Sequence, residues 1–95
     1  MKKLYILISK QYNESYRAVQ AGHALAEYLI KNQEEDSWQN ETLIYILSDD
    51  IYFDYQILQE MGMNLFPFYE PDVDDRMTAF ACYSDHKVFH RYAMN

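Results

Sequence analysis

Two runs of apolar residues constrain the fold of this chain more than any other feature. Residues 3–9, K-L-Y-I-L-I-S, and residues 42–47, T-L-I-Y-I-L, are nearly continuous in apolar, β-branched and aromatic side chains. Such runs are typical of strands covered on both faces of a sheet. A helix-like segment separates them, and a strand–helix–strand order needs a crossover, which predicts a parallel pair.

The helix between these strands is predicted to run to about Lys31. Asn13 or Ser15 is placed to cap it by accepting a hydrogen bond from a free N–H of the first turn. A stripe of apolar and small residues recurs with the 3.6-residue period of a helix and is expected to pack on the sheet. Its members are Ala18, Ala21, Gly22, Leu25, Tyr28 and Leu29.

A second helix is predicted over residues 51–61. Ser48-Asp49-Asp50 supplies its start, because hydroxyl and carboxylate oxygens accept from first-turn N–H groups, and Gly62 suits a left-handed cap at its end. Its inward residues are expected to be Ile51, Tyr55, Leu58 and Met61.

Two further strands are predicted at residues 65–69 and 77–83, with an acidic loop at 70–76 between them. Pro67 favours an edge position for the first of these, and residues 84–95 read as a short helix or a frayed tail. The order is therefore β-α-β-α-β-β. It predicts one α/β domain over residues 1–95, with a four-stranded mixed, mostly parallel sheet flanked by helices.

Composition limits the classes of function. The net charge is −7 and the pI about 4.7, which disfavours general nucleic-acid binding unless the cations gather on one face. The sequence has no apolar run of membrane-spanning length, and the apolar run after Met1 is too short for a signal peptide. The lone Cys82 cannot form an internal disulfide and suits a reducing cytoplasm.

Polar residues form a second stripe on the first helix. Tyr16, Gln20, His23 and Glu27 align on a helical wheel, offset from the apolar stripe. They either line a ligand groove, with His23 as acid, base or donor near neutral pH, or form a solvated flank with a His23–Glu27 pair. The residue pattern alone leaves both interpretations open.

No metal or cofactor is predicted. Asp72-x-Asp74 resembles the start of a calcium loop but lacks its glycine and its bidentate glutamate. Cys82, His86 and His90 are spaced by four, yet Cys82 falls within a predicted strand, so the spacing does not make a zinc site.

Three segments together resemble a known family. They are A-V-Q-A-G-H-A-L-A-E-Y at 18–28, N-E-T-L-I-Y-I-L at 40–47 after Trp38, and F-Y-E-P-D-V-D-D-R-M-T-A-F-A at 68–81. With the element order, they resemble the type II peptidyl-tRNA hydrolases, and most of all their small bacterial and phage relatives. The resemblance implies a four-stranded mixed sheet flanked by helices, with no cofactor. It also implies hydrolysis of the ester between a peptide and the 3′ end of tRNA.

The same resemblance implies a site. Gln20 and His23 match the helix glutamine and histidine of the family, Glu70 or Asp72 stands at the position of its aspartate, and Thr78 at that of its threonine. A carboxylate and a hydroxyl would orient a water toward the ester carbonyl. The cations Lys10, Arg17, Lys87 and Arg91 are expected to converge beside Gln20 and bind the tRNA or peptidyl-tRNA.

The chain also departs from the family pattern. Tyr16, with Arg17 beside it, stands where the family has a lysine, and the loop before Thr78 is shortened. A-C-Y-S replaces the family's closing I-G-P turn, and its basic surface is missing. An alternative is therefore an inactive relative that acts as a protein-binding module or a homodimer, since its acidic, Tyr-rich surface suits an interface.

Overall fold

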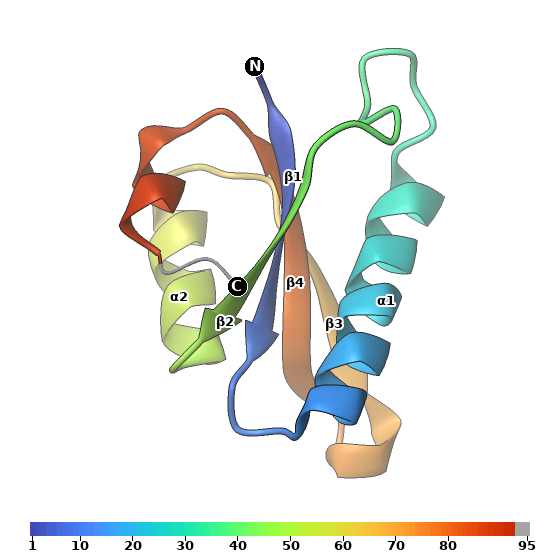
Figure 1. The fold of residues 1–95 in the computed structure, drawn as a ribbon, viewed down its shortest axis with the longest axis vertical. Coiled ribbons are helices and arrows are strands. Elements are labelled where there is room, and N and C mark those ends of the chain that lie inside the picture. Colours follow the sequence, from blue (N-terminus) through green and yellow to red (C-terminus); the bar gives the residue numbers. More distant parts are fainter. Residues whose placement is uncertain (93–95) are drawn as a thin grey trace.

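A computed structural model of the chain describes residues 1–92 and contains the predicted element order. Four strands and two helices alternate, and two short 3-10 helices (η1 and η2) follow the last two strands (Figure 1). The bounds are β1 (Lys3–Ser9), α1 (Glu14–Lys31), β2 (Leu43–Ser48), α2 (Ile51–Glu60), β3 (Phe66–Glu70), η1 (Pro71–Val73), β4 (Arg76–Ser84) and η2 (Lys87–Arg91). Neither α-helix among these residues has the length and apolar character needed to cross a membrane.

The sheet is mixed but not mostly parallel. Its strand order is β2-β1-β4-β3, and only β1 and β2 pair in parallel, while β4 runs antiparallel to both β1 and β3. The expectation of a mostly parallel sheet is wrong because β4 returns between β1 and β3. Pro67 does lie on an edge strand, and β1 is central, as predicted. By contrast, β2 is the second edge: its Ile46 and Ser48 are buried, whereas Leu43 and Tyr45 are exposed.

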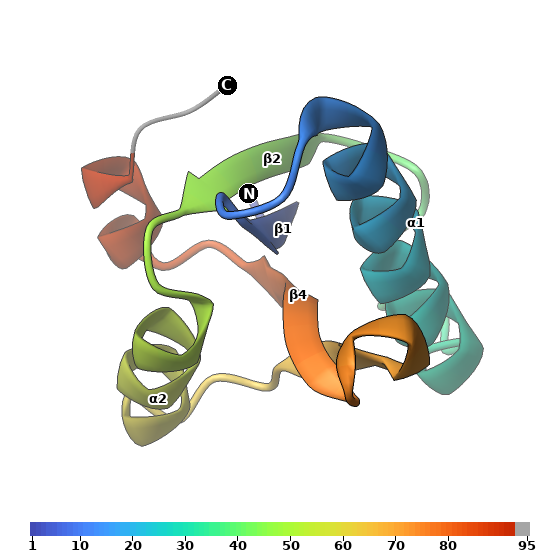
Figure 2. The same ribbon diagram turned by 90° about the horizontal axis from the view of Figure 1, so that it is seen from below.

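Helices cover both faces of this sheet. α1 lies on one face, and α2 with η2 lies on the other (Figures 1 and 2). Alternate residues of β1 serve the two cores: Leu4, Ile6 and Ile8 pack with α1, and Tyr5 and Leu7 pack toward α2 and η2. This period of two is what a central strand requires.

The buried face of α1 differs from the predicted stripe. The helix buries Gln20, Ala21, Ala24 and Tyr28, because it packs on β1, β4 and β3. Ala18, Gly22 and Leu29 are exposed, so their assignment to the core is wrong. A Cβ on Gly22 would meet no atom within 4 Å. A glycine at this position is therefore not what allows α1 to pack close to the sheet.

The helix ends follow the expected chemistry. The Asn13 side chain accepts from the Tyr16 N–H, and Asp50 accepts from the Phe53 N–H, so Asn13 and Asp50 are the N-caps. Gly62 has a φ of 84° and follows the end of α2, as a left-handed cap requires. In α2, Ile51 and Leu58 are buried, but Met61 is exposed, which corrects its expected inward position.

The segment after β4 is part of the core. η2 brings Phe89 onto Tyr5 of β1, where the two rings stack at 4.0 Å with an interplanar angle of 8°. Phe89 is fully buried and Val88 is nearly so. Of the two predicted alternatives, a short helix is correct through Arg91, and residues 93–95 lie outside the described part of the chain.

We predict that Phe89→Ala lowers the free energy of unfolding by about 3–5 kcal/mol, because it removes a buried ring and leaves a cavity against Tyr5. His90→Ala, an exposed neighbour on the same 3-10 helix, should change it by less than about 0.5 kcal/mol. Urea unfolding followed by circular dichroism measures both. Equal effects of the two substitutions would show that η2 does not pack as described.

Candidate functional site

Three side chains far apart in the sequence form one hydrogen-bonded network. The Gln20 amide of α1 donates through Nε2 to Oε1 of Glu70 at 2.8 Å, and the Thr78 hydroxyl donates to Oε1 of Gln20 at 2.6 Å. Glu70 ends β3 and Thr78 lies on β4. Gln20 and Thr78 are 0% exposed and Glu70 is 7% exposed. The network thus ties α1 to two strands of the sheet.

A β-bulge sets the direction of Thr78. In the β3–β4 pairing, Phe68 lies opposite Ala79 and Tyr69 opposite Met77, so Thr78 is the extra residue on β4. Met77 joins the core on the α2 side, whereas Ala79 joins the core under α1. The bulge resets the alternation of the strand and allows the Thr78 hydroxyl to point toward α1, where it reaches Gln20.

The network keeps the Glu70 carboxyl charged. Hydrogen bonding from the Gln20 amide lowers the pKa of Glu70 below its ordinary 4.5, with smaller contributions from the Asp72 backbone N–H and the His23 side chain. Burial acts in the opposite direction but is outweighed. The Asp72 N–H donates to Oε2 at 3.3 Å. At neutral pH the site therefore holds a nearly buried carboxylate.

Tyr16 and His23 flank the network along α1. The Tyr16 hydroxyl is buried without a hydrogen-bond partner among the described residues. Burial, with the Glu70 and Asp72 charges, raises the pKa of Tyr16, so its phenol stays protonated. His23 is exposed and stacks on Phe68 of β3 at 4.3 Å. The alternative His23–Glu27 pair does not form, since Glu27 pairs with Lys31 at 3.3 Å.

The four cations expected beside Gln20 do not converge. Lys10 and Arg17 lie at the carboxyl end of β1, where Arg17 donates to the Lys10 carbonyl at 2.7 Å and Lys10 pairs with Asp49 at 3.5 Å. Lys87 and Arg91 belong to η2 on the opposite face of the sheet (Figure 1). The expectation fails for these two because η2 folds back onto the α2 side.

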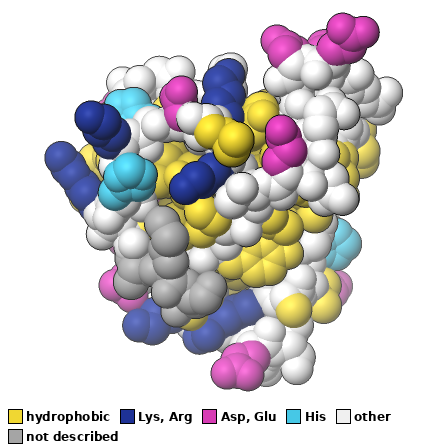
Figure 3. Space-filling model, turned by 45° about the horizontal axis from the view of Figure 1, so that its top comes forward, with side chains coloured by type: hydrophobic (Ala, Val, Ile, Leu, Met, Phe, Trp, Pro, Cys, Tyr) yellow, Lys and Arg dark blue, Asp and Glu magenta, His cyan; other side chains and the backbone are white. Residues whose placement is uncertain are grey.

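Figure 3 brings forward the end of the molecule at which the N-terminus lies and shows where charged side chains gather on that face. Basic and histidine side chains gather on the side occupied by η2 and the N-terminus, a further group of Lys and Arg side chains lies at the lower edge, and acids project near the α1–β2 loop (Figure 3). On this face the basic side chains are therefore divided between two places.

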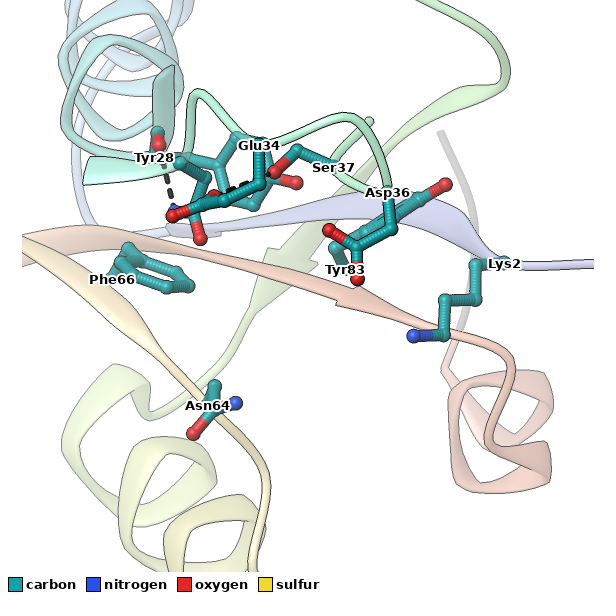
Figure 4. Close-up of a pocket in the computed structure, with 9 residues that line it drawn as sticks. Lys2, Tyr28, Glu34, Asp36, Ser37, Asn64, Phe66 and Tyr83 are labelled. Carbon is teal, nitrogen blue, oxygen red and sulfur yellow. Dashed lines mark hydrogen bonds between the residues drawn. The ribbon is translucent and has the colours of Figure 1, made fainter. Parts of the chain in front are cut away.

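Two polar hollows lie at opposite ends of the sheet. One, of about 190 Å³, includes Lys2, Glu34, Asp36 and Tyr83, with the Ser37 hydroxyl donating to Glu34 (Figure 4). The other, of about 180 Å³, lies at the carboxyl ends of β1 and β2; its lining includes Ser9, Asp49, Asp50 and Arg76. Neither is lined by Gln20, Glu70 or Thr78.

The soft-ligand interpretation of Cys82 finds no support. Its thiol is buried in the core beside Met63, and burial raises the pKa of Cys82 to about 12. His86 instead caps η2 by accepting from the Val88 N–H. Residues 1–92 contain no group of three His, Cys, Asp or Glu side chains arranged to hold a metal ion.

No protein-family model matches the sequence, and no curated protein matches it either. The site is therefore interpreted from its own geometry, together with the resemblance of its motifs.

We predict that Thr78→Val lowers the free energy of unfolding by about 1–3 kcal/mol, because it leaves the buried Gln20 carbonyl oxygen unpaired while preserving side-chain shape. Thr42→Val, at an exposed threonine, is the matched control and should be nearly neutral. Chemical denaturation of the two variants and the wild type gives the comparison. A neutral Thr78→Val would mean that the network is not formed in solution.

The stability of the network should depend on pH. Because the pKa of Glu70 is lowered in the folded protein from 4.5, its charge stabilises the fold above that value, and this contribution is lost as the pH falls through the lower folded pKa. Wild type and Glu70→Gln should therefore differ most in unfolding free energy near pH 7. Their difference should shrink below pH 4.5. A difference that is constant with pH would contradict the assignment.

Proposed function

We propose that the chain is a peptidyl-tRNA hydrolase-like enzyme that cleaves the ester between a peptide and the 3′ end of tRNA. The observation that carries this proposal is the Gln20–Glu70–Thr78 network. These three residues are among those that the motif resemblance groups into a site, although Glu70 and Thr78 lie 50 and 58 positions from Gln20. Glu70, rather than the exposed Asp72, is the carboxylate in the network.

In the proposed reaction, Glu70 holds the attacking water. Its ionised carboxylate accepts a proton as the water oxygen bonds to the acyl carbon. The ester C–O bond then breaks, its electron pair leaves with the ribose oxygen, and that oxygen takes up the proton held by the Glu70 carboxyl, which returns to its ionised form. Gln20 and Thr78 are positioning residues: the Thr78 hydroxyl fixes the Gln20 amide so that its N–H faces Glu70.

Neighbouring donors fit the developing negative charge on the ester carbonyl oxygen. The Tyr16 phenol is protonated and lacks a partner within residues 1–92, so it is available to donate in place of the family lysine. Arg17 carries a permanent charge at the same end of α1 but cannot serve as a base near pH 7. His23 forms an aromatic wall with Phe68, on which a terminal base would stack.

The charge distribution favours a small contact with RNA. Of the four cations expected at the site, Lys10 and Arg17 lie together at the amino end of α1. Lys87 and Arg91 lie on η2, on the opposite face of the sheet, and would not contact the same phosphates. With a net charge of −7, an extended tRNA surface would be repelled. The proposed substrate contact is therefore confined to the 3′ end.

We predict that the protein hydrolyses an N-blocked aminoacyl-tRNA and that Glu70→Gln lowers kcat/KM by about 10²–10⁴-fold, because the general base is removed with its shape retained. Asp72→Asn is the matched control, since Asp72 engages the network through its backbone N–H; it should change kcat/KM by only a few-fold. Release of the labelled amino acid measures both.

Turnover by Glu70→Gln equal to that of a folded wild type would refute the proposed role of Glu70. A folded wild type with no turnover would refute the enzyme assignment itself. Added salt should also lower kcat/KM, because the few phosphate contacts are electrostatic.

One observation favours a second candidate, an inactive protein-binding module. Gln20 and Thr78 are fully buried and satisfy each other, as a purely structural network would. This candidate predicts no turnover and a stable complex that Gln20→Ala leaves intact.

A further inference from the structure

The two edges of the sheet are built differently. The β3 edge carries Pro67, which has no backbone N–H to donate to a further strand, and the pairing of β3 with β4 is irregular after Phe68. The β2 edge, Leu43–Ser48, has six residues with no proline and no charged side chain, and its register with β1 is regular throughout. Within residues 1–92, β2 is thus an edge strand (Figure 2) without a proline, a charged side chain or an irregular register.

The pattern of hydrogen bonds shows which backbone groups of β2 are free to pair. The Leu4 N–H donates to Thr42 O, and the Lys10 N–H donates to Ser48 O, so the even-numbered residues of β2 face β1. Because the partners alternate along a strand, the N–H and C=O groups of Leu43, Tyr45 and Leu47 point away from the sheet. These three residues can form a ladder with another strand.

The side chains of the same three residues form an apolar surface beside α1. Leu43 and Tyr45 are 37% and 38% exposed. Tyr45 and Leu47 form one side of a hollow of about 380 Å³ whose other side is the first turns of α1, with Ala18 and the charged Glu14 and Arg17. A second hollow is lined by Leu25 and Leu29 of α1 and by Trp38. The first turns of α1 thus border Tyr45 and Leu47 of β2.

We propose that β2 pairs with β2 of a second copy of the chain in an antiparallel, two-fold symmetric dimer that extends the sheet. A register centred on Tyr45 places Tyr45 opposite its own copy and Leu43 opposite Leu47 of the other chain. Each such pair exchanges both of its N–H···O=C bonds, because all three residues have outward backbone groups. The opposed side chains, Tyr45 with Tyr45 and Leu43 with Leu47, are all apolar or aromatic and lie on the α1 face of the sheet, which favours association.

Charge is compatible with this partner. Residues 42–48 contain no ionisable side chain apart from the phenol of Tyr45, so the strand itself carries no like charges into the contact. The net charge of −7 on each copy opposes association at long range. Dimer affinity should therefore rise with added salt, the opposite of the salt response of a contact made by ion pairs.

The test is the mass of the full chain by light scattering and sedimentation over a range of concentrations. Tyr45→Lys should raise the dimer dissociation constant by about tenfold or more, since like charges would face each other across the dyad. Tyr69→Lys is the control: Tyr69 is 49% exposed on the protected β3 edge, and the substitution changes the net charge equally. The control should leave the dissociation constant unchanged.

Hydrogen exchange on the wild type gives an independent result that needs no variant. Protection of the Leu43, Tyr45 and Leu47 amides should rise with protein concentration, while that of the β3 amides should not. A wild type that is monomeric at its highest soluble concentration overturns the proposal. So does a dimer that survives folded Tyr45→Lys, a dimer equally weakened by Tyr69→Lys, or protection that does not depend on concentration.

Discussion

A buried glutamine side chain is the constraint on which the rest of this structure depends. An amide inside a core must satisfy both its carbonyl and its N–H groups, because an unpaired buried polar group costs about 1–3 kcal/mol. Gln20 is fully buried. Its carbonyl oxygen accepts a hydrogen bond from the Thr78 hydroxyl, and its N–H donates to the Glu70 carboxylate. This requirement fixes how α1 sits on β3 and β4. It also accounts for the bulge, which turns Thr78 toward the helix.

The same interaction gives the site its chemical character. A carboxylate that is nearly buried would ordinarily be driven toward its neutral form, but donation from Gln20 keeps the Glu70 carboxyl charged. The protonated Tyr16 phenol next to it supplies a donor of the opposite kind. A base and a donor beside each other are what ester hydrolysis requires. The proposed activity follows from that pairing and from the motifs that carry it.

The sequence predicts the elements well and their assembly less well. Apolar runs and cap residues correctly locate the strands, the helices and the ends at Asn13, Asp50 and Gly62. Periodicity placed Ala18, Ala21, Tyr28 and Leu29 in one apolar stripe. It could not tell that Ala21 and Tyr28 face the sheet while Ala18 and Leu29 are exposed, since all four are similarly apolar. The direction of β4, the Thr78 bulge and the fold-back of η2 depend on pairings between distant residues. The motif resemblance grouped Gln20 and Thr78 with Glu70 or Asp72. The expectation that Lys87 and Arg91 join them came from the hydrolase hypothesis, and η2 places these two on the opposite face of the sheet.

The central claim is that the Gln20 amide holds Glu70 as a buried carboxylate. Carbon-13 NMR titration of the Glu70 carboxyl carbon, in the wild type and in folded Gln20→Leu, measures this directly. The account predicts a wild-type midpoint below 4.5 and a higher midpoint in Gln20→Leu, where burial acts without the amide. A wild-type midpoint at or above the ordinary value, or one that Gln20→Leu leaves in place, would contradict it.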